Sequence, residues 1–172
     1  MKLGILFISG FLSAAMTAFP LSAMAADSEC VASNATHALY SGDNPAQVDA
    51  IFRDMHLEAR HAVDHADKLH LFARNSNLTW ESDVSQLQPI KEEINEMGGQ
   101  VCRLEAMRAE VAPRQQAEID RIATTIRLMA DHAEDAISFG NSHRQGLWLA
   151  PYRRYADNLY HESELLARTL RY

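Results

Sequence analysis

The sequence predicts an all-α protein, an up-down-up-down four-helix bundle, on the basis of three observations. Apolar residues recur at alternating spacings of three and four along four segments, which is the period of an amphipathic helix. No stretch between these segments alternates apolar and polar residues with the period of two that a half-buried strand requires. The connections between the segments are short, and short connections join antiparallel neighbours in a bundle.

The composition is that of a single globular domain. The chain has 172 residues, of which 47% are hydrophobic and 23% are charged, unlike a disordered polyelectrolyte or a multi-span membrane protein. Its formal net charge is -7, and no cluster of basic residues supplies the positive surface that nucleic acids require. We therefore expect no nucleic-acid partner.

Residues 1–25 are typical of a cleaved secretory signal peptide from a bacterium. Lys2 provides the positive start, residues 3–19 are apolar, and small residues precede the predicted cleavage after Ala25. The apolar run of 17 residues is at the lower limit of the roughly 17 to 25 that span a bilayer, which favours cleavage over an uncleaved anchor. We expect a periplasmic or secreted protein without stable membrane insertion, with an irregular N-terminal strap at 26–44 and the bundle at 45–172.

The first helix is predicted at residues 45–74. Asn44 is a favourable N-cap, and Pro45 suits the first helical position, where a missing N–H is not needed. The polar run at 75–77 ends the pattern. The apolar seam of this helix, meaning the stripe expected to face the core, consists of Phe52, Met55, Ala59, Ala62, Ala66, Leu69 and Ala73.

The second helix is predicted to run to Ala112, before Pro113. Arg108 stands where its pattern calls for an apolar residue. Gly98 and Gly99 lie inside it, and a glycine costs about 1 kcal/mol relative to alanine in a helix, so we expect either a kink or the close approach of a neighbouring helix. Its seam consists of Leu87, Ile90, Ile94, Met97, Val101, Leu104 and Val111.

The third and fourth helices complete the bundle. Gly140 and Asn141 are expected to stop the third helix, and Pro151 is expected to begin the fourth, which continues to the C-terminus. The third seam consists of Ile119, Ile122, Ile126, Met129, Ala133, Ala136 and Ile137. The fourth, which is wider and more aromatic, consists of Tyr152, Tyr155, Leu159, Leu166 and Leu170.

The two cysteines, Cys30 and Cys102, are predicted to form a disulfide in an oxidising compartment. Closing a loop of about 70 residues would stabilise the fold by several kcal/mol in the chain-entropy model. Two independent thiols are the alternative. Neither cysteine lies in a Cys-x-x-Cys or Cys-x-x-Cys-His motif, so thioredoxin-like chemistry and c-type haem attachment are not indicated.

Histidines are concentrated in the first helix, which holds four of the eight in the chain. Glu58, His61 and His65 recur along one helix flank, so they are candidate ligands for a divalent ion such as Zn, Cu or Ni. His132 and His161 are candidates for further ligands from other helices. The alternative is a solvated helix face on which histidines and acids alternate.

Other cofactor and enzyme classes find less support. A di-iron bundle needs a second Glu-x-x-His motif besides Glu58-x-x-His61, and the chain has none. Met55 or Met129 could pair with His161 at a b-type haem, but methionines at seam positions are usually core residues. Serine nucleophile elbows, phosphate-binding glycine loops and His-Glu-x-x-His are absent, so we assign no catalytic residue and expect a non-enzymatic protein.

A dense aromatic and arginine stretch at the start of the fourth helix is the candidate interaction surface, because tryptophan, tyrosine and arginine are enriched in interface hot spots. The alternative is that the tyrosines pack the core and the arginines pair with the surplus acids. The candidate residues are Trp148, Tyr152, Arg153, Arg154, Tyr155 and Tyr160.

Five short motifs resemble a group of uncharacterised exported helical proteins of soil bacteria. They are SQL at 85–87, IKEEINEMG at 90–98, DRIA at 120–123, LMAD at 128–131 and YADNLY at 155–160. The resemblance covers about residues 78 to 165 and implies no activity, cofactor or site residue, because no function is assigned to that group.

Together these patterns predict a non-enzymatic bundle that binds a protein partner, or a second copy of itself, in the cell envelope. The alternative is a divalent-metal-binding envelope protein that uses the histidine-rich face of the first helix. An enzyme, a haem protein or a di-iron protein is the least supported of the alternatives.

Overall fold

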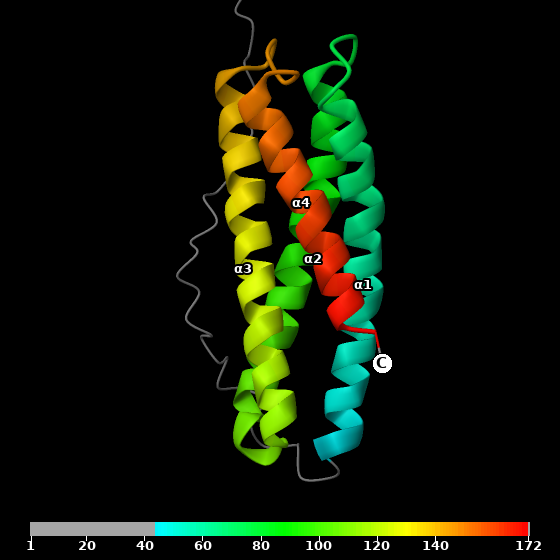
Figure 1. Ribbon diagram of the computed structural model, residues 1–172, viewed down its shortest axis with the longest axis vertical. Helices are drawn as coiled ribbons and strands as arrows, with labels where there is room; N and C mark the ends of the chain where they lie inside the picture. The colour runs from blue at the N-terminus through cyan, green and yellow to red at the C-terminus, as the bar shows by residue number, and fades with distance from the viewer. Residues whose placement is uncertain (1–43, 172) are drawn as a thin grey trace, which may run out of the picture.

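The computed structural model describes residues 44–171, which form four long helices and one turn of 3-10 helix (Figure 1). No strand occurs within this range. The predicted signal peptide at 1–25 and the strap up to residue 43 lie outside the described residues. The elements are α1 (Asn44–Phe72), α2 (Trp80–Ala106), η1 (Arg108–Glu110), α3 (Pro113–Ser142) and α4 (Ala150–Thr169).

The helices form an up-down-up-down bundle, which confirms the predicted fold class. α1 packs against α2 and α4, and α3 packs against the same two helices, so the four form a closed ring. The α1–α2 and α3–α4 connections lie at one end of the bundle, and the α2–α3 connection lies at the other (Figure 1). α4 is the shortest helix and ends part-way along the bundle (Figure 1). Among the described residues no helix is both long and apolar enough to cross a membrane.

The core lies where the predicted seams meet. Every seam residue predicted in α1 is buried, from Phe52 to Ala73. In the other helices the seam residues are also buried, except Val101, Ile137 and Tyr155, which are half-buried at its margin. The largest fully buried side chains are Tyr152, Phe52, Met55, Leu69, Ile90, Met97, Leu104, Ile119, Ile122, Met129, Leu159 and Leu166. Burial of these apolar surfaces is the main stabilising contribution to the fold.

The closest approach at a glycine occurs at Gly140, not at Gly98 and Gly99. α2 runs through Gly98 and Gly99 without a break, and a methyl group added at either position would have open space around it. The expectation of a close helix approach there is therefore wrong. At Gly140 an added methyl group would overlap the six-membered ring of Trp80. Gly140 also does not stop its helix at once, since α3 continues to Ser142.

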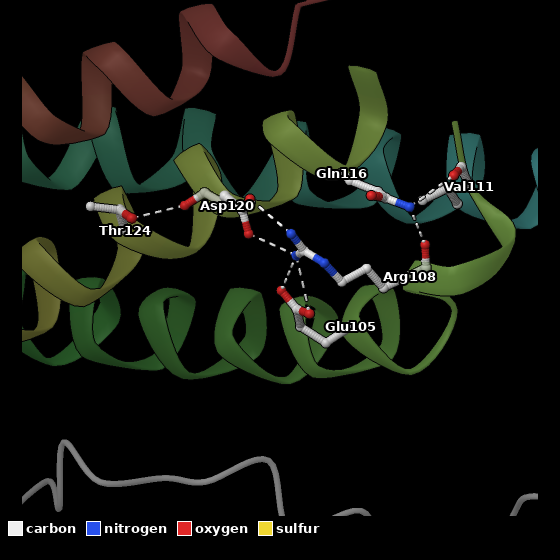
Figure 2. Close-up of polar contacts among 6 residues, drawn as sticks. All are labelled: Glu105, Arg108, Val111, Gln116, Asp120 and Thr124. Atoms are coloured by element: carbon white, nitrogen blue, oxygen red, sulfur yellow. Dashed lines mark hydrogen bonds and ion pairs between the residues drawn. The ribbon is translucent and has the colours of Figure 1, made fainter. Parts of the chain in front are cut away.

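α2 ends at Ala106, six residues before the predicted end at Ala112. The chain then turns through η1, where the Gln116 amide of α3 donates hydrogen bonds to the carbonyl of Arg108 and to that of Val111, the residue after η1, at 2.9 and 3.2 Å (Figure 2). Pro113 then begins α3, at a position where its missing N–H does not matter.

Arg108 occupies the apolar place in the pattern because it lies in this turn, where its side chain bridges two helices. Its guanidinium points between Glu105 of α2 and Asp120 of α3 (Figure 2). The shortest nitrogen–oxygen distances are 3.0 Å to Glu105 and 2.7 Å to Asp120. Hydrogen bonding to Arg108 lowers the pKa of the Asp120 carboxyl. The polar residue in the seam is therefore explained by an ion pair across the α2–α3 corner.

Candidate functional site

The three candidate ligands on α1 do not converge on one point. The Glu58 carboxylate lies 4.0 Å from Nδ1 of His61, whose side chain is 62% exposed on the outer surface. His65 instead lies against α2, where its Nδ1 is 3.0 Å from Oε1 of Gln86. Because Gln86 Oε1 can only accept, Nδ1 carries the proton of that bond. His61 and His65 therefore lie in different environments.

Glu93 of α2 is the most unusual charged residue on the α1–α2 interface. It is only 9% exposed, and its Oε2 has no hydrogen-bond partner in the described structure. Its Oε1 lies 4.0 Å from Nε2 of His65, too far for a hydrogen bond. Burial, the largest cause, and the negative charges of Glu58, Glu96, Glu92 and Asp64 together raise the pKa of Glu93 to about 7.

His70 and Arg74, at the end of α1, both contact Asp157 of α4. Nη2 of Arg74 donates to the two carboxylate oxygens at 2.8 and 3.0 Å. Nδ1 of His70 lies 2.8 Å from Oδ1, although the angle of this contact is not that of a hydrogen bond. Asp157 is thus neutralised by Arg74, and by His70 as well when the imidazole is protonated.

His132 of α3 contacts α4 in the same manner. Nδ1 of His132 is 3.0 Å from Oε2 of Glu162, and its Nε2 is 2.8 Å from the Asn158 amide nitrogen. The imidazole thus donates to Glu162 and accepts from Asn158 when neutral. Burial raises the pKa of Glu162, and the hydrogen bond from His132 partly offsets that effect.

The candidate metal ligands are therefore distributed over separate helix interfaces. Glu58, His61 and His65 lie on α1, His132 is engaged by α4, and His161 is exposed on the outer face of α4. Nowhere in residues 44–171 do three His, Cys, Asp or Glu side chains form a group that could hold a metal ion. The five candidate ligands thus lie at separate positions in this arrangement, because the rotation of the packed helices directs them to different neighbours.

The residues considered for a haem are also apart. Met55 and Met129 are fully buried core residues, whereas His161 is exposed. The ring of His161 lies against the ring of Tyr160, with 5.6 Å between their centroids. An axial pair would need a methionine and a histidine facing the same space, and these residues do not.

A buried acid lies near the end of the bundle that carries the α1–α2 and α3–α4 connections. Asp83 of α2 is almost fully buried, and burial raises the pKa of its carboxyl to about 6 against the lowering effect of the Tyr152 hydroxyl. Oδ1 of Asp83 and the Tyr152 hydroxyl nevertheless form no hydrogen bond of normal geometry. The same burial raises the pKa of Tyr152. The three acids with raised pKa values, Asp83, Glu93 and Glu162, thus lie in separate environments, and no two of them form a catalytic pair.

Exposed apolar side chains gather at the same end of the bundle. Trp148 is 51% exposed and Leu149 is 37% exposed in the α3–α4 connection, and Leu78 is exposed in the α1–α2 connection. We call these three residues the loop-end surface. Four other large apolar residues are exposed on helix faces, namely Leu57, Leu71, Leu128 and Leu165.

The predicted interaction residues are only partly on this surface. Trp148, Arg153 and Arg154 are exposed as expected, and Tyr155 and Tyr160 are half-buried. Tyr152 is fully buried, so its assignment to an interaction surface is wrong. It lies on the core side of α4 because that helix turns its aromatic seam inward.

Arginines line an open depression beside the loop-end surface. Its volume is about 240 Å³, and Arg74, Ala150, Arg153, Arg154 and Asp157 surround it. The interaction residues predicted from the sequence include Arg153 and Arg154 but not Arg74 or Asp157. Arg74 lies 79 positions before Arg153 in the chain, and no local pattern connects them.

The predicted disulfide involves one residue that the structure describes. Cys102 is half-buried on α2, whereas Cys30 lies outside the described residues. The pairing of Cys30 with Cys102 therefore stays a prediction from the sequence and its expected compartment.

Comparison of the chain with protein families, with characterised proteins and with solved structures found no match in any of the three.

Proposed function

We propose that this protein is a non-enzymatic binding module of the bacterial cell envelope, which holds a protein partner against the loop end of its bundle. The observation that carries the proposal is the exposure of Trp148, at 51%, next to exposed Leu149 in the chain, with exposed Leu78 in the other connection at the same end of the bundle (Figure 1). The exposed half of this indole does not pack in the core, and it provides a large apolar area that a partner can cover.

The position of this surface supports the same proposal. It lies on connections, which a rigid bundle can present without disturbing its core. The other exposed leucines lie on helix faces, and apolar residues scattered on a surface are ordinary. Arginines border the loop-end surface on the α4 side, and arginine and tryptophan are the residues most enriched in binding hot spots.

Site-specific photo-crosslinking in cells that produce the protein tests this proposal. A photoreactive amino acid at position 148 should give a discrete adduct with one partner protein, because the side chain there lies in the interface. The matched control is position 128, where Leu128 is 45% exposed on α3, away from the loop end. We expect no adduct of the same mass from that position.

Two outcomes would contradict the proposal. The same adducts from positions 148 and 128 would indicate random collisions, and no adduct at position 148 would indicate that no partner covers the tryptophan. An adduct with the mass of two copies of this chain would replace the separate partner with self-association.

A further inference from the structure

We infer that the depression formed by Arg74, Arg153 and Arg154 binds the carboxylates of an acidic peptide segment. This inference deepens the proposed function, since it states the chemistry of the partner that the loop-end surface would hold. It is carried by the charge balance of the depression, by the unpaired state of two of its arginines and by the exposed tryptophan beside it.

The charge balance of the depression is positive although the whole chain is acidic. Three arginines line it together with one carboxylate, that of Asp157. Arg74 neutralises Asp157 through hydrogen bonds to both carboxylate oxygens. Arg153 and Arg154 then remain as two uncompensated charges on a chain whose formal net charge is -7.

Arg153 and Arg154 have no side-chain hydrogen bond or ion pair among the described residues, and both are exposed. Elsewhere in the described residues Arg108 pairs with Asp120 and Arg168 pairs with Glu164, whereas no acid pairs with Arg153 or Arg154. A guanidinium donates in a planar fork that matches a carboxylate, and two adjacent free forks suit a segment with more than one carboxylate.

Two further features favour an extended peptide over a small anion. The depression is open, so a small anion bound there would keep much of its water and gain little. Ala150, the first residue of α4, lies in its wall. Leu149 and Trp148 come directly before Ala150, so an apolar side chain of the same peptide could lie against the indole while its acids meet the arginines.

Fluorescence anisotropy with a labelled hexaglutamate peptide and the purified protein tests this inference. We expect saturable binding that weakens as salt increases, because the contact is electrostatic and exposed. Arg153→Ala/Arg154→Ala should weaken the affinity at least tenfold. Both side chains are exposed, so the double variant should retain its thermal midpoint and helical circular dichroism.

Matched controls separate this site from general charge attraction. Arg114→Ala/Arg121→Ala removes two exposed arginines from α3 and should leave the affinity within twofold. A hexaglutamine peptide should not bind. An equal loss in both double variants, or no saturable binding of hexaglutamate, would overturn the inference. So would complete displacement of the peptide by inorganic phosphate at constant ionic strength, since that would make the depression a small-anion site.

Failure here is distinguishable from failure of the proposed function. If position 148 crosslinks to a partner but hexaglutamate does not bind, the partner-binding role stands and its acidic chemistry is wrong. If hexaglutamate binds through Arg153 and Arg154 but position 148 gives no adduct, the site has the inferred chemistry and the partner-binding role is wrong.

Discussion

The free energy of unfolding should rise as pH falls from 8 to 5, opposite to the trend of proteins stabilised by ionised acids. Burial raises the pKa of Glu93 from 4.5 to about 7 and that of Asp83 from 3.8 to about 6. The folded state therefore keeps these protons at pH values where the unfolded chain has lost them. Their stabilising effect is fully present below the unfolded pKa values and is lost as pH rises through about 6 and 7.

The expected size follows from the shifts. Between pH 8 and pH 5, Glu93 contributes about 2.5 kcal/mol and Asp83 about 1.5 kcal/mol to the change in the free energy of unfolding. Urea denaturation at both pH values measures the difference. The charges that face Glu93 are Glu58, Asp64 and His65 on α1, together with Glu92 and Glu96 on its own helix.

Glu93→Gln isolates the contribution of this residue to the pH dependence. The variant should be about 2 kcal/mol more stable than the wild type at pH 8 and close to it at pH 5, because a neutral amide lacks the desolvation penalty of a buried carboxylate. Glu110→Gln, at an exposed position of η1 whose charge is not among those that raise the pKa of Glu93, should leave the pH dependence nearly unchanged. A Glu93→Gln variant with the full wild-type slope would show that Glu93 does not carry the effect.

Gly140→Ala should destabilise the protein by about 1 to 3 kcal/mol, although alanine is the better helix former. The added methyl group would overlap the ring of Trp80, which packs against the core and is not the free end of a flexible side chain. Urea denaturation followed by far-UV circular dichroism measures the change. Gly140→Val should cost more, because its branched side chain is larger and less favourable in a helix.

Gly98→Ala and Gly99→Ala are the matched controls, since an added methyl group meets nothing within 4 Å at either position. Each should stabilise the protein by up to about 1 kcal/mol. In a double-mutant cycle, Trp80→Leu should remove most of the penalty of Gly140→Ala, because the clashing ring is gone. If Gly140→Ala is as stabilising as Gly98→Ala, the Trp80 ring moves aside freely and the steric argument is wrong.

Most of the fold was predictable because a helix that is buried on one side has a periodic apolar pattern in its own sequence. The seam from Phe52 to Ala73 followed from spacing alone, since any helix that packs on one side repeats its apolar residues with a period near 3.6. The end of α2 was not predictable in the same way. The turn after it includes hydrogen bonds from the Gln116 side chain of α3 to the carbonyls of Arg108 and Val111, a contact that spacing within α2 does not encode.

Two buried acids, Asp83 and Glu93, also leave a signal in the sequence. Asp83 lies four residues before Leu87, so it continues the seam of α2 toward its N-terminus. Glu93 lies between Ile90 and Met97, at spacings of three and four from them, which also places it beside the core. An acid at a seam spacing therefore indicates a carboxyl with a raised pKa.

The sequence by itself determined four amphipathic helices, their order and the residues that each turns toward the core, because those properties depend on neighbours three and four positions away. Only the tertiary structure decided which flanking residues of different helices meet. It placed His65 beside Glu93, His132 beside Glu162, and Arg74 beside Arg153 and Arg154. These pairings depend on the rotation and axial register of the packed helices. The packing of all four seams together sets that rotation and register, so no single segment of the sequence encodes them.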